Sequence, residues 1–367
     1  MFYLDYQATT PLSPEARAAM EPWLGHFANP HSPSRWGREA AAAIEHARGQ
    51  IALLLPSGGE VVFTSGATEA INWALRGVRA GERRKIVTIA TEHAAVLDTC
   101  EWLEAQGYEV VRLPVGSDGL LSLDDVKAAV DERTLLVSAM LVNNEIGVIH
   151  PVAEIARIAH DSGALMLCDA VQGFGRMAVP DGPDLIAVSS HKIHGPKGSG
   201  ALWVRDGVTL EPLIHGGGQE RGLRSGTMSP MLCAGFGAAA AIASERMEAD
   251  HEHVEHLWAA ALATLGPAWE INGTIEHRYR GNLNIRREGL DAARLISDLR
   301  DIAFSLGSAC ASGSGRPSHV LRALGLADRE ARSSVRLGFG RYTTEAELID
   351  ACRRIDATAV AQGRFAA

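Results

Sequence analysis

The sequence predicts an α/β fold, with a large domain built on a mostly parallel sheet flanked by helices and a smaller α+β domain towards the C-terminus. From about Val61 to Val204, short apolar segments alternate with amphipathic stretches, a pattern typical of strands joined by crossover helices. The chain has 367 residues, a length that suits one large domain and a smaller one. After Gly266-Pro267 the pattern changes to shorter segments and a Gly/Ser-rich stretch, which indicates a second unit.

The predicted strands are short, apolar and rich in β-branched residues. In chain order they are Val61–Phe63, Ile86–Ile89, Glu109–Leu113, Leu135–Ala139, Ala164–Leu167 and Leu185–Val188. The helices expected between them are Thr68–Val78, Ala95–Gln106, Leu123–Val130 and Pro151–Ser162. The last of these begins with proline, which the first turn of a helix tolerates.

A long alanine-rich helix is expected from Pro230 towards Leu265, joining the two units. A shorter helix is expected around Asp291–Leu299. We therefore expect the large domain to span residues 15–250 and the smaller domain to combine residues 1–14 with 251–367.

The composition excludes several classes of protein. Hydrophobic residues make up 46% and charged residues 22%, as in globular proteins, and the net charge of -9 argues against a general nucleic-acid binder. No apolar run approaches the length of a membrane span, and the first residues lack the pattern of a signal peptide. The five cysteines are widely spread without a Cys-x-x-Cys pair, which fits a reducing compartment. We expect a cytoplasmic protein that binds no membrane.

A lysine follows the last predicted strand of the alternating region. Ser189-Ser190-His191-Lys192 comes directly after Leu185–Val188, at the carboxyl end of the strand, where open α/β sheets bind their ligands. A lysine there can lose its proton and form a Schiff base. An isolated lysine is better interpreted as a surface residue, so this hypothesis needs cofactor-binding groups elsewhere.

The segment Thr64–Glu69 predicts a phosphate site. A strand, a turn of small residues and a helix follow one another, so backbone N–H groups and the Thr68 hydroxyl can hold an anion at the helix N-terminus. An ordinary helix cap explains the same residues about equally well. The glycines of Gly195–Gly200 lack the spacing of a P-loop, so nucleotide binding has little support.

Two more strands end in polar side chains. Asp169 follows Ala164–Leu167, and its carboxylate can pair with a protonated pyridine nitrogen, while Gln172 can hydrogen-bond a phenolic oxygen. His93 follows another strand and can stack on a ring or move a proton. Each residue alone is better explained as structural, but with Lys192 and Thr68 they make four candidate groups at the ends of four predicted strands, which favours one shared site.

The chain resembles the cysteine desulfurases of the NifS/IscS type, in the class V aminotransferase family of pyridoxal-phosphate enzymes with fold type I. The resemblance runs almost from end to end and implies pyridoxal 5'-phosphate as cofactor and a seven-stranded type of sheet. The matching motifs are Tyr3–Pro11, Thr64–Glu69, Glu92-His93, Val142–Gly147, Asp169–Gln172, His191–Gly198, Gly216–Thr227, Gly307–Cys310 and Ser333–Arg336.

The resemblance implies a role for each matching position. Lys192 is the implied Schiff-base lysine, His93 the residue stacked on the ring, and Arg336 the clamp for the substrate carboxylate, which suits a planar guanidinium. Thr227 is implied to reach the phosphate of a neighbouring subunit, hence a homodimer with shared sites. The other implied contacts are Ala67, Thr68, Ser189 and His191 at the phosphate, and Asp169, Gln172 and Asn144 at the ring, with Asn144 also near the substrate.

Cys310 distinguishes the reaction from others in the family. It lies among small residues between Ser305 and Gly315, where a thiol is exposed and reactive, whereas the other four cysteines lie in apolar contexts that favour packing. The stretch Leu306–Arg322 resembles the longer loop of the NifS/IscS subgroup rather than the shorter loop of the SufS subgroup. No metal site is expected, apart from transient ligation of a nascent iron–sulfur cluster by Cys310.

The implied function is transfer of sulfur from L-cysteine to Cys310, giving L-alanine and a persulfide for iron–sulfur cluster assembly or another sulfur-transfer pathway. The implied partner is a sulfur-acceptor or scaffold protein, with nucleic acid involved only indirectly through tRNA thiolation. Alternatives are a selenocysteine lyase, another class V aminotransferase activity or an inactive sulfur-relay adaptor; Lys192 and Cys310 together argue against the adaptor. Two departures from the family pattern are Ser34, where a histidine is frequent, and the end of the chain at Ala367, so the acceptor is left open.

Overall fold

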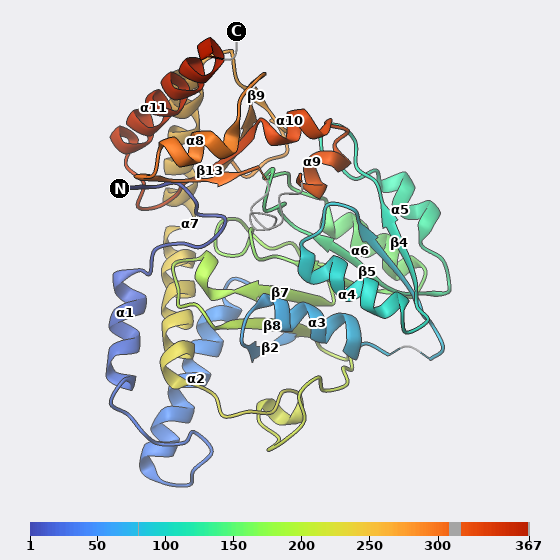
Figure 1. The fold of residues 1–367 in the computed structure, drawn as a ribbon. Helices are drawn as coiled ribbons and strands as arrows, with labels where there is room; N and C mark the ends of the chain where they lie inside the picture. The colour runs from blue at the N-terminus through green and yellow to red at the C-terminus, as the bar shows by residue number, and fades with distance from the viewer. Residues whose placement is uncertain (80, 308–316, 366–367) are drawn as a thin grey trace.

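The computed structural model describes residues 1–79, 81–307 and 317–365, and its centre is a seven-stranded sheet (Figure 1). The strands are β2 (Gly59–Thr64), β3 (Lys85–Ile89), β4 (Glu109–Leu113), β5 (Thr134–Met140), β6 (Leu165–Asp169), β7 (Leu185–Ser189) and β8 (Gly200–Arg205). Their order across the sheet is β2-β8-β7-β6-β5-β3-β4, and β8 alone runs antiparallel to its neighbours. The predicted α/β class with a mostly parallel sheet is confirmed.

Strand β8 is absent from the strands expected from the sequence. Its apolar core, Ala201–Val204, follows glycines that are typical of loops. Packing requires a glycine at position 200, because a Cβ on Gly200 would lie 2.6 Å from the Cα of Gly66. A strand glycine at such a close approach of two backbones is compatible with the sheet, and here it places β8 against the turn that begins the next helix.

Helices cover both faces of this sheet because alternate strand residues point to opposite faces. On one face lie α3 (Ala67–Gly77) and α4 (Ala94–Glu104), and on the other lie α1 (Pro14–Met20), α2 (Arg35–Ala52), α5 (Leu123–Ala129), α6 (Val152–Asp161) and the first half of α7 (Pro230–Leu265). The alternation is visible in β2, where Val61 and Phe63 pack on one face and Val62 on the other. The predicted helices agree to within a residue or two, except that Pro151 caps α6 and is not in its first turn.

A hydrophobic cluster separate from those on the two faces of the large sheet lies around a smaller antiparallel sheet. Its strands, in spatial order, are β12 (Ser305–Leu306), β13 (Ser334–Gly338), β10 (Asn282–Arg286) and β9 (Glu270–Ile271). The N-terminal strand β1 (Phe2–Tyr3) joins this part of the molecule by pairing in parallel with β11 (Ile302–Ala303). Helices α8 (Ala292–Asp298) and α11 (Glu345–Phe365) belong to the same part, and α9 (His319–Ala323) and α10 (Asp328–Arg332) precede β13 in the chain.

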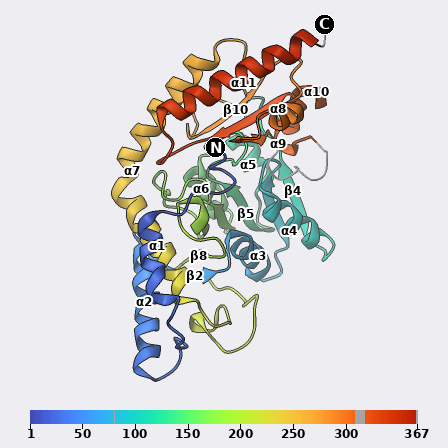
Figure 2. The ribbon, with the colours of Figure 1, turned by 60° about the vertical axis from the view of Figure 1, so that its left-hand side comes forward.

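Helix α7 links two of the hydrophobic clusters, one at each sheet. Figure 2 shows it along one side of the molecule, with α1 and α2 beside its N-terminal half and α11 beside its C-terminal half. Its first half packs into a cluster of the large sheet, and residues from Val254 to Leu265 pack into the cluster of the smaller sheet. The domain boundaries expected from the sequence stay a prediction. Within the described ranges, no helix is both long enough and apolar enough to cross a membrane.

Candidate active site

A cavity of about 590 Å³ opens at the carboxyl ends of the parallel strands. Its walls come from the segments after β2, β3, β5, β6 and β7, from the N-terminal segment Gln7–Thr9, and from β13. The sheet edge therefore brings together most of the residues singled out in the sequence. Those that line the cavity are Ala67, Thr68, His93, Asn144, Asp169, Gln172, Ser189, His191, Lys192 and Arg336.

Lys192 ends a single 3-10 turn that follows β7 directly. Its Nζ donates to the backbone carbonyl of Ala8 at 2.9 Å and also to that of Gln7. These two carbonyls belong to a segment that has no assigned role in the sequence analysis. They hold the lysine amine inside the cavity, in reach of a bound molecule.

Asp169 is the last residue of β6 and is 6% exposed. Its Oδ1 accepts the N–H of Val171 at 3.0 Å. Burial raises the pKa of the Asp169 carboxyl, and the neighbouring His93 ring and the Lys192 ammonium oppose this shift. A carboxylate in such surroundings is stable as an anion when a cation lies beside it, and a protonated pyridine nitrogen meets that need.

Gln172 is held by hydrogen bonds at both ends of its amide. Its Nε2 donates to the carbonyl of Gln7 at 3.0 Å, and its Oε1 accepts from Nη1 of Arg176 at 2.7 Å. Arg176 also donates to the carbonyl of Lys192 at 2.8 Å. The contacts to Gln7 and Arg176 thus fix the orientation of the amide. Since an amide nitrogen carries two N–H groups, the contact to Gln7 uses only one of them.

His93 caps the N-terminus of α4. Its Nδ1 accepts the N–H of Ala95 at 3.1 Å, which assigns the proton of the neutral ring to Nε2. Burial lowers the pKa of His93, so the ring is neutral near pH 7. Behind it Glu92 is completely buried, and its Oε1 accepts the N–H of Met140 at 2.6 Å. This contact ties the segment after β3 to the end of β5 and fixes the position of His93.

The turn between β2 and α3 leaves the N-terminus of α3 without a side-chain cap. Gly66 is the N-cap of α3 and has no side chain to cover the first turn, and a Cβ there would meet nothing within 4 Å. Ala67 and Thr68 line the cavity, and backbone N–H groups in the first turn of a helix have no partner within the helix, which suits an anion. His191 lies nearby with Nδ1 3.1 Å from Oγ1 of Thr9, and burial lowers the pKa of its ring to about 4.

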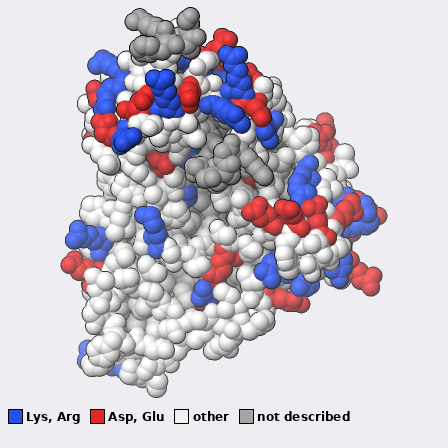
Figure 3. Space-filling model, viewed as in Figure 1, with Lys and Arg blue, Asp and Glu red and all other residues white. Residues whose placement is uncertain are grey.

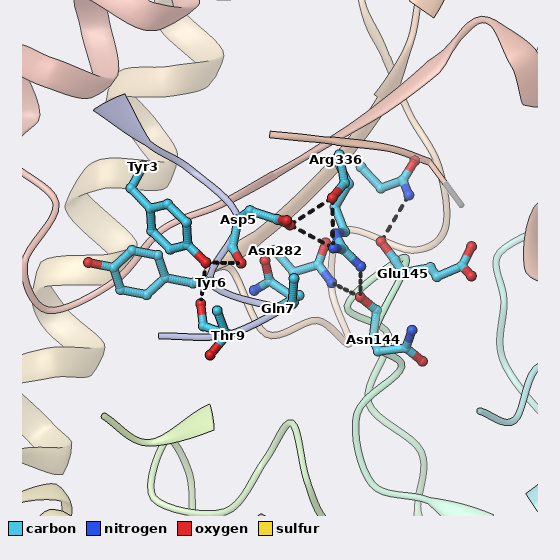
Figure 4. A network of polar contacts seen from close by, with 12 residues as sticks. Tyr3, Asp5, Tyr6, Gln7, Thr9, Asn144, Glu145, Asn282 and Arg336 are labelled. Atoms are coloured by element: carbon cyan, nitrogen blue, oxygen red, sulfur yellow. Dashed lines mark hydrogen bonds and ion pairs between the residues drawn. The ribbon is translucent and has the colours of Figure 1, made fainter. Parts of the chain in front are cut away.

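Arg336 reaches the cavity from β13 of the smaller sheet and is 1% exposed (Figure 4). Its Nη2 lies 2.8 Å from Oδ1 of Asp5, and its Nη1 donates to the carbonyl of Asn144 at 2.9 Å. Asn282 donates to the same carbonyl at 3.1 Å. The Asn144 backbone therefore fixes the guanidinium, a contact not anticipated from the sequence.

Among the described residues, Thr227 is a predicted site residue that does not line the cavity. Thr227 is exposed. Cys310 lies outside the described residues. The implied role of Thr227 across a subunit interface and that of Cys310 as sulfur carrier stay predictions here.

The donor set fits pyridoxal phosphate. The open N-terminus of α3 suits its phosphate, the buried Asp169 suits its ring nitrogen, and the Lys192 amine suits its aldehyde. The Gln172 amide suits its phenolic oxygen. These groups come from different strand ends, which explains why no single sequence motif describes the site.

Comparisons with known proteins agree with this geometry. The chain is 45% identical over 360 residues to a protein of Rickettsia bellii (strain OSU 85-389) named cysteine desulfurase IscS, covering 94% of this chain and 88% of that protein. A solved NifS-like protein shares the fold with a TM-score of 0.89 and 34% identity, covering 97% of this chain and 98% of that one. A structure described as SspA in complex with cysteine has a TM-score of 0.83 and 35% identity, covering 94% of this chain and 100% of that one. Residues 2–350 match the family described as Aminotransferase class-V, and the chain belongs to this family.

Proposed function

We propose that the protein is a pyridoxal-phosphate-dependent cysteine desulfurase, which takes sulfur from L-cysteine and releases L-alanine. The observation that carries this proposal is the meeting of Lys192, Asp169 and Arg336 in one cavity at the sheet edge. Similar proteins named cysteine desulfurase and a related structure described as a complex with cysteine support the choice of substrate.

The chain's own residues bind and orient the cofactor and substrate. Pyridoxal phosphate, when bound, supplies an electron-withdrawing ring that stabilises negative charge on the Cα of an amino acid. Ala67, Thr68, Ser189 and His191 bind its phosphate, Asp169 keeps its ring nitrogen protonated, and Gln172 donates to its phenolic oxygen. Arg336 binds the substrate carboxylate through its planar guanidinium.

Two side chains move protons. Lys192, once its amine is released and neutral, takes the Cα proton, and the carbonyls of Gln7 and Ala8 hold that amine in the cavity. His93 is neutral because burial lowers its pKa, so its ring can take the substrate thiol proton.

Cys310 completes the reaction as a nucleophile. Its thiolate forms a bond with the substrate sulfur, and the bond between that sulfur and the substrate Cβ breaks. The electron pair of the broken bond stays with Cβ, which gains a proton, so the carbon product is L-alanine and the sulfur product is a persulfide on Cys310. The persulfide then serves iron–sulfur cluster assembly or another sulfur-transfer pathway through an acceptor protein.

The active unit in this proposal is a homodimer. Leu24 and Phe27 of the connection between α1 and α2, and Trp36 at the start of α2, are 73%, 84% and 55% exposed. Charged side chains gather on the upper and right-hand parts of the face in Figure 3, and its lower part carries few. An exposed apolar patch of this kind marks a contact surface, and Thr227 is also exposed, as a residue that reaches a neighbouring subunit must be.

We place the dimer in the cytoplasm because the four described cysteines are free and buried.

The proposal is tested with purified protein, pyridoxal phosphate, L-cysteine and a thiol reductant. Sulfide and L-alanine should form in equal amounts, and borohydride should fix the cofactor to the peptide that contains Lys192. Lys192→Ala should lose both products, while Lys127→Ala, at an exposed lysine of α5, should retain them. Preference for L-selenocysteine, or amino transfer to a keto acid, would replace the proposal with one of its alternatives.

A further inference from the structure

Asp5 contacts the arginine that the proposed function assigns to the substrate carboxylate. Its Oδ1 lies 2.8 Å from Nη2 of Arg336 and accepts a hydrogen bond of 2.8 Å from Oγ of Ser305 (Figure 4). We infer that Asp5 is a positioning residue that fixes the Arg336 guanidinium for the substrate carboxylate. This inference rests on the proposed function.

The backbone on both sides of Asp5 is fixed to the strand that carries Arg336. The N–H of Gly338 donates to the carbonyl of Leu4 at 2.7 Å, and the N–H of Tyr6 donates to the carbonyl of Gly338 at 3.3 Å. The Tyr3 hydroxyl donates to the carbonyl of Thr9 at 2.8 Å, which closes the segment on itself. The Asp5 carboxylate therefore has a defined place relative to β13.

Three separate segments hold the guanidinium. Asp5 comes from the N-terminus, Ser305 from β12, and the Asn144 carbonyl from the segment after β5. Ser305 is paired with Arg336 in the register of β12 and β13. Since an arginine side chain has several rotatable bonds, contacts at both Nη atoms are what restrict it to one orientation.

Asp5 also balances a buried charge. Arg336 is 1% exposed, and a buried cation without a partner is unfavourable when no substrate is present. A guanidinium has five N–H donors, and the contacts to Asp5 and Asn144 leave others for a second carboxylate. One of them is Nε, for which the described residues provide no acceptor.

The same short segment positions the reactive amine. The Gln7 and Ala8 carbonyls, two and three residues after Asp5, accept hydrogen bonds from Lys192. The segment thus sets the place of the carboxylate clamp and of the lysine together. This connection explains how a residue of the smaller sheet can be aligned with the strand ends of the large one.

The test compares Asp5→Ala with Asp5→Asn in the holoenzyme. Asn keeps an oxygen that can accept from Arg336 and Ser305, and Ala does not. We expect Asp5→Ala to raise the KM for L-cysteine about 10–100-fold, the effect of losing a charge-assisted hydrogen bond, with kcat changed less than about threefold. Asp5→Asn should restore the KM to within about threefold of wild type. Glu15→Ala, at an exposed carboxylate of α1, is the matched control.

A second readout follows binding without turnover. The cofactor absorption is titrated with L-alanine, which has the α-carboxylate, and with ethylamine, which lacks it. Asp5→Ala should weaken only the L-alanine response. An unchanged KM and an unchanged L-alanine affinity in Asp5→Ala would overturn the inference. A lower KM in either variant would also overturn it, because Asp5 would then compete with the substrate for Arg336. Absence of sulfide release by wild type would instead overturn the proposed function.

Discussion

Gly200 offers a direct link between packing and cofactor binding. It begins β8, and a Cβ at this position would lie 2.6 Å from the Cα of Gly66, 2.7 Å from its carbonyl carbon and 2.8 Å from the carbonyl oxygen of Val188. All three contacts are to backbone atoms, so no flexible side chain can move aside. Gly200→Ala must therefore displace the Gly66 turn, which carries the proposed phosphate site.

The size of the effect follows from these distances. Carbon atoms in contact are about 3.5–4.0 Å apart, so the turn must retreat by roughly 1 Å. Overpacking of this kind costs about 1–3 kcal/mol of the free energy of unfolding. Displacement of N–H donors from an anion loses a charge-assisted hydrogen bond, which weakens cofactor binding by about 10–100-fold.

Two measurements on the apoprotein check this prediction. Denaturant unfolding should give the lower free energy of unfolding, and titration with pyridoxal phosphate should give the weaker affinity. The control is Gly49→Ala in α2, where a Cβ would meet nothing within 4 Å; it should stabilise the protein by about 0.5–1 kcal/mol and leave the affinity unchanged. A Gly200→Ala protein with wild-type stability and affinity would show that the reasoning about the turn is wrong.

Two further predictions concern histidines. His93→Ala should lower kcat by about 10²–10⁴-fold and keep the cofactor absorption band, because the loss affects proton transfer rather than cofactor retention; a wild-type kcat would contradict the proposed role. His150 is 2% exposed, and burial lowers its pKa from about 6.5 to about 4. Below pH 6.5 the imidazole is protonated in the unfolded chain, whereas in the folded chain it is protonated only below about pH 4. As the pH falls to 4, His150 therefore lowers the free energy of unfolding by about 3 kcal/mol. His150→Leu should therefore lose less unfolding free energy between pH 6.5 and 4 than wild type, as measured by denaturant titrations at each pH. An equal loss of unfolding free energy in the two proteins would contradict this assignment.

The sheet and most of the site could be predicted from the sequence for one physical reason. Parallel strands place their carboxyl ends at one edge, so polar residues that follow separate apolar runs converge there. Lys192, Asp169 and His93 each follow such a run and all line the cavity. The four described cysteines lie in helices or strands and are buried, as their apolar contexts predict.

What could not be predicted depends on contacts between distant segments. Asp5 meets Arg336 across 331 positions of the chain, and Gln7 meets Lys192 across 185. The second contact is made by a backbone carbonyl, which has no sequence signature. The available signal was the presence of Asp5 and Gln7 among apolar and aromatic neighbours near the N-terminus, because such polar residues are buried only when they have partners. Strand β8 was not predicted because glycines precede its apolar core, and glycines are also typical of loops. The close approach of β8 to Gly66 requires a glycine at position 200.

The central claim is that sulfur leaves L-cysteine as a persulfide on Cys310. Its most direct test is mass spectrometry of the holoenzyme after a single addition of L-cysteine without reductant. In wild type, the peptide that contains Cys310 should gain one sulfur atom for each L-alanine formed. Cys310→Ser should keep the cofactor absorption band, form no persulfide and release sulfide more slowly than wild type. Release of sulfide at the wild-type rate by Cys310→Ser, or a persulfide on another cysteine in the wild type, would contradict the account.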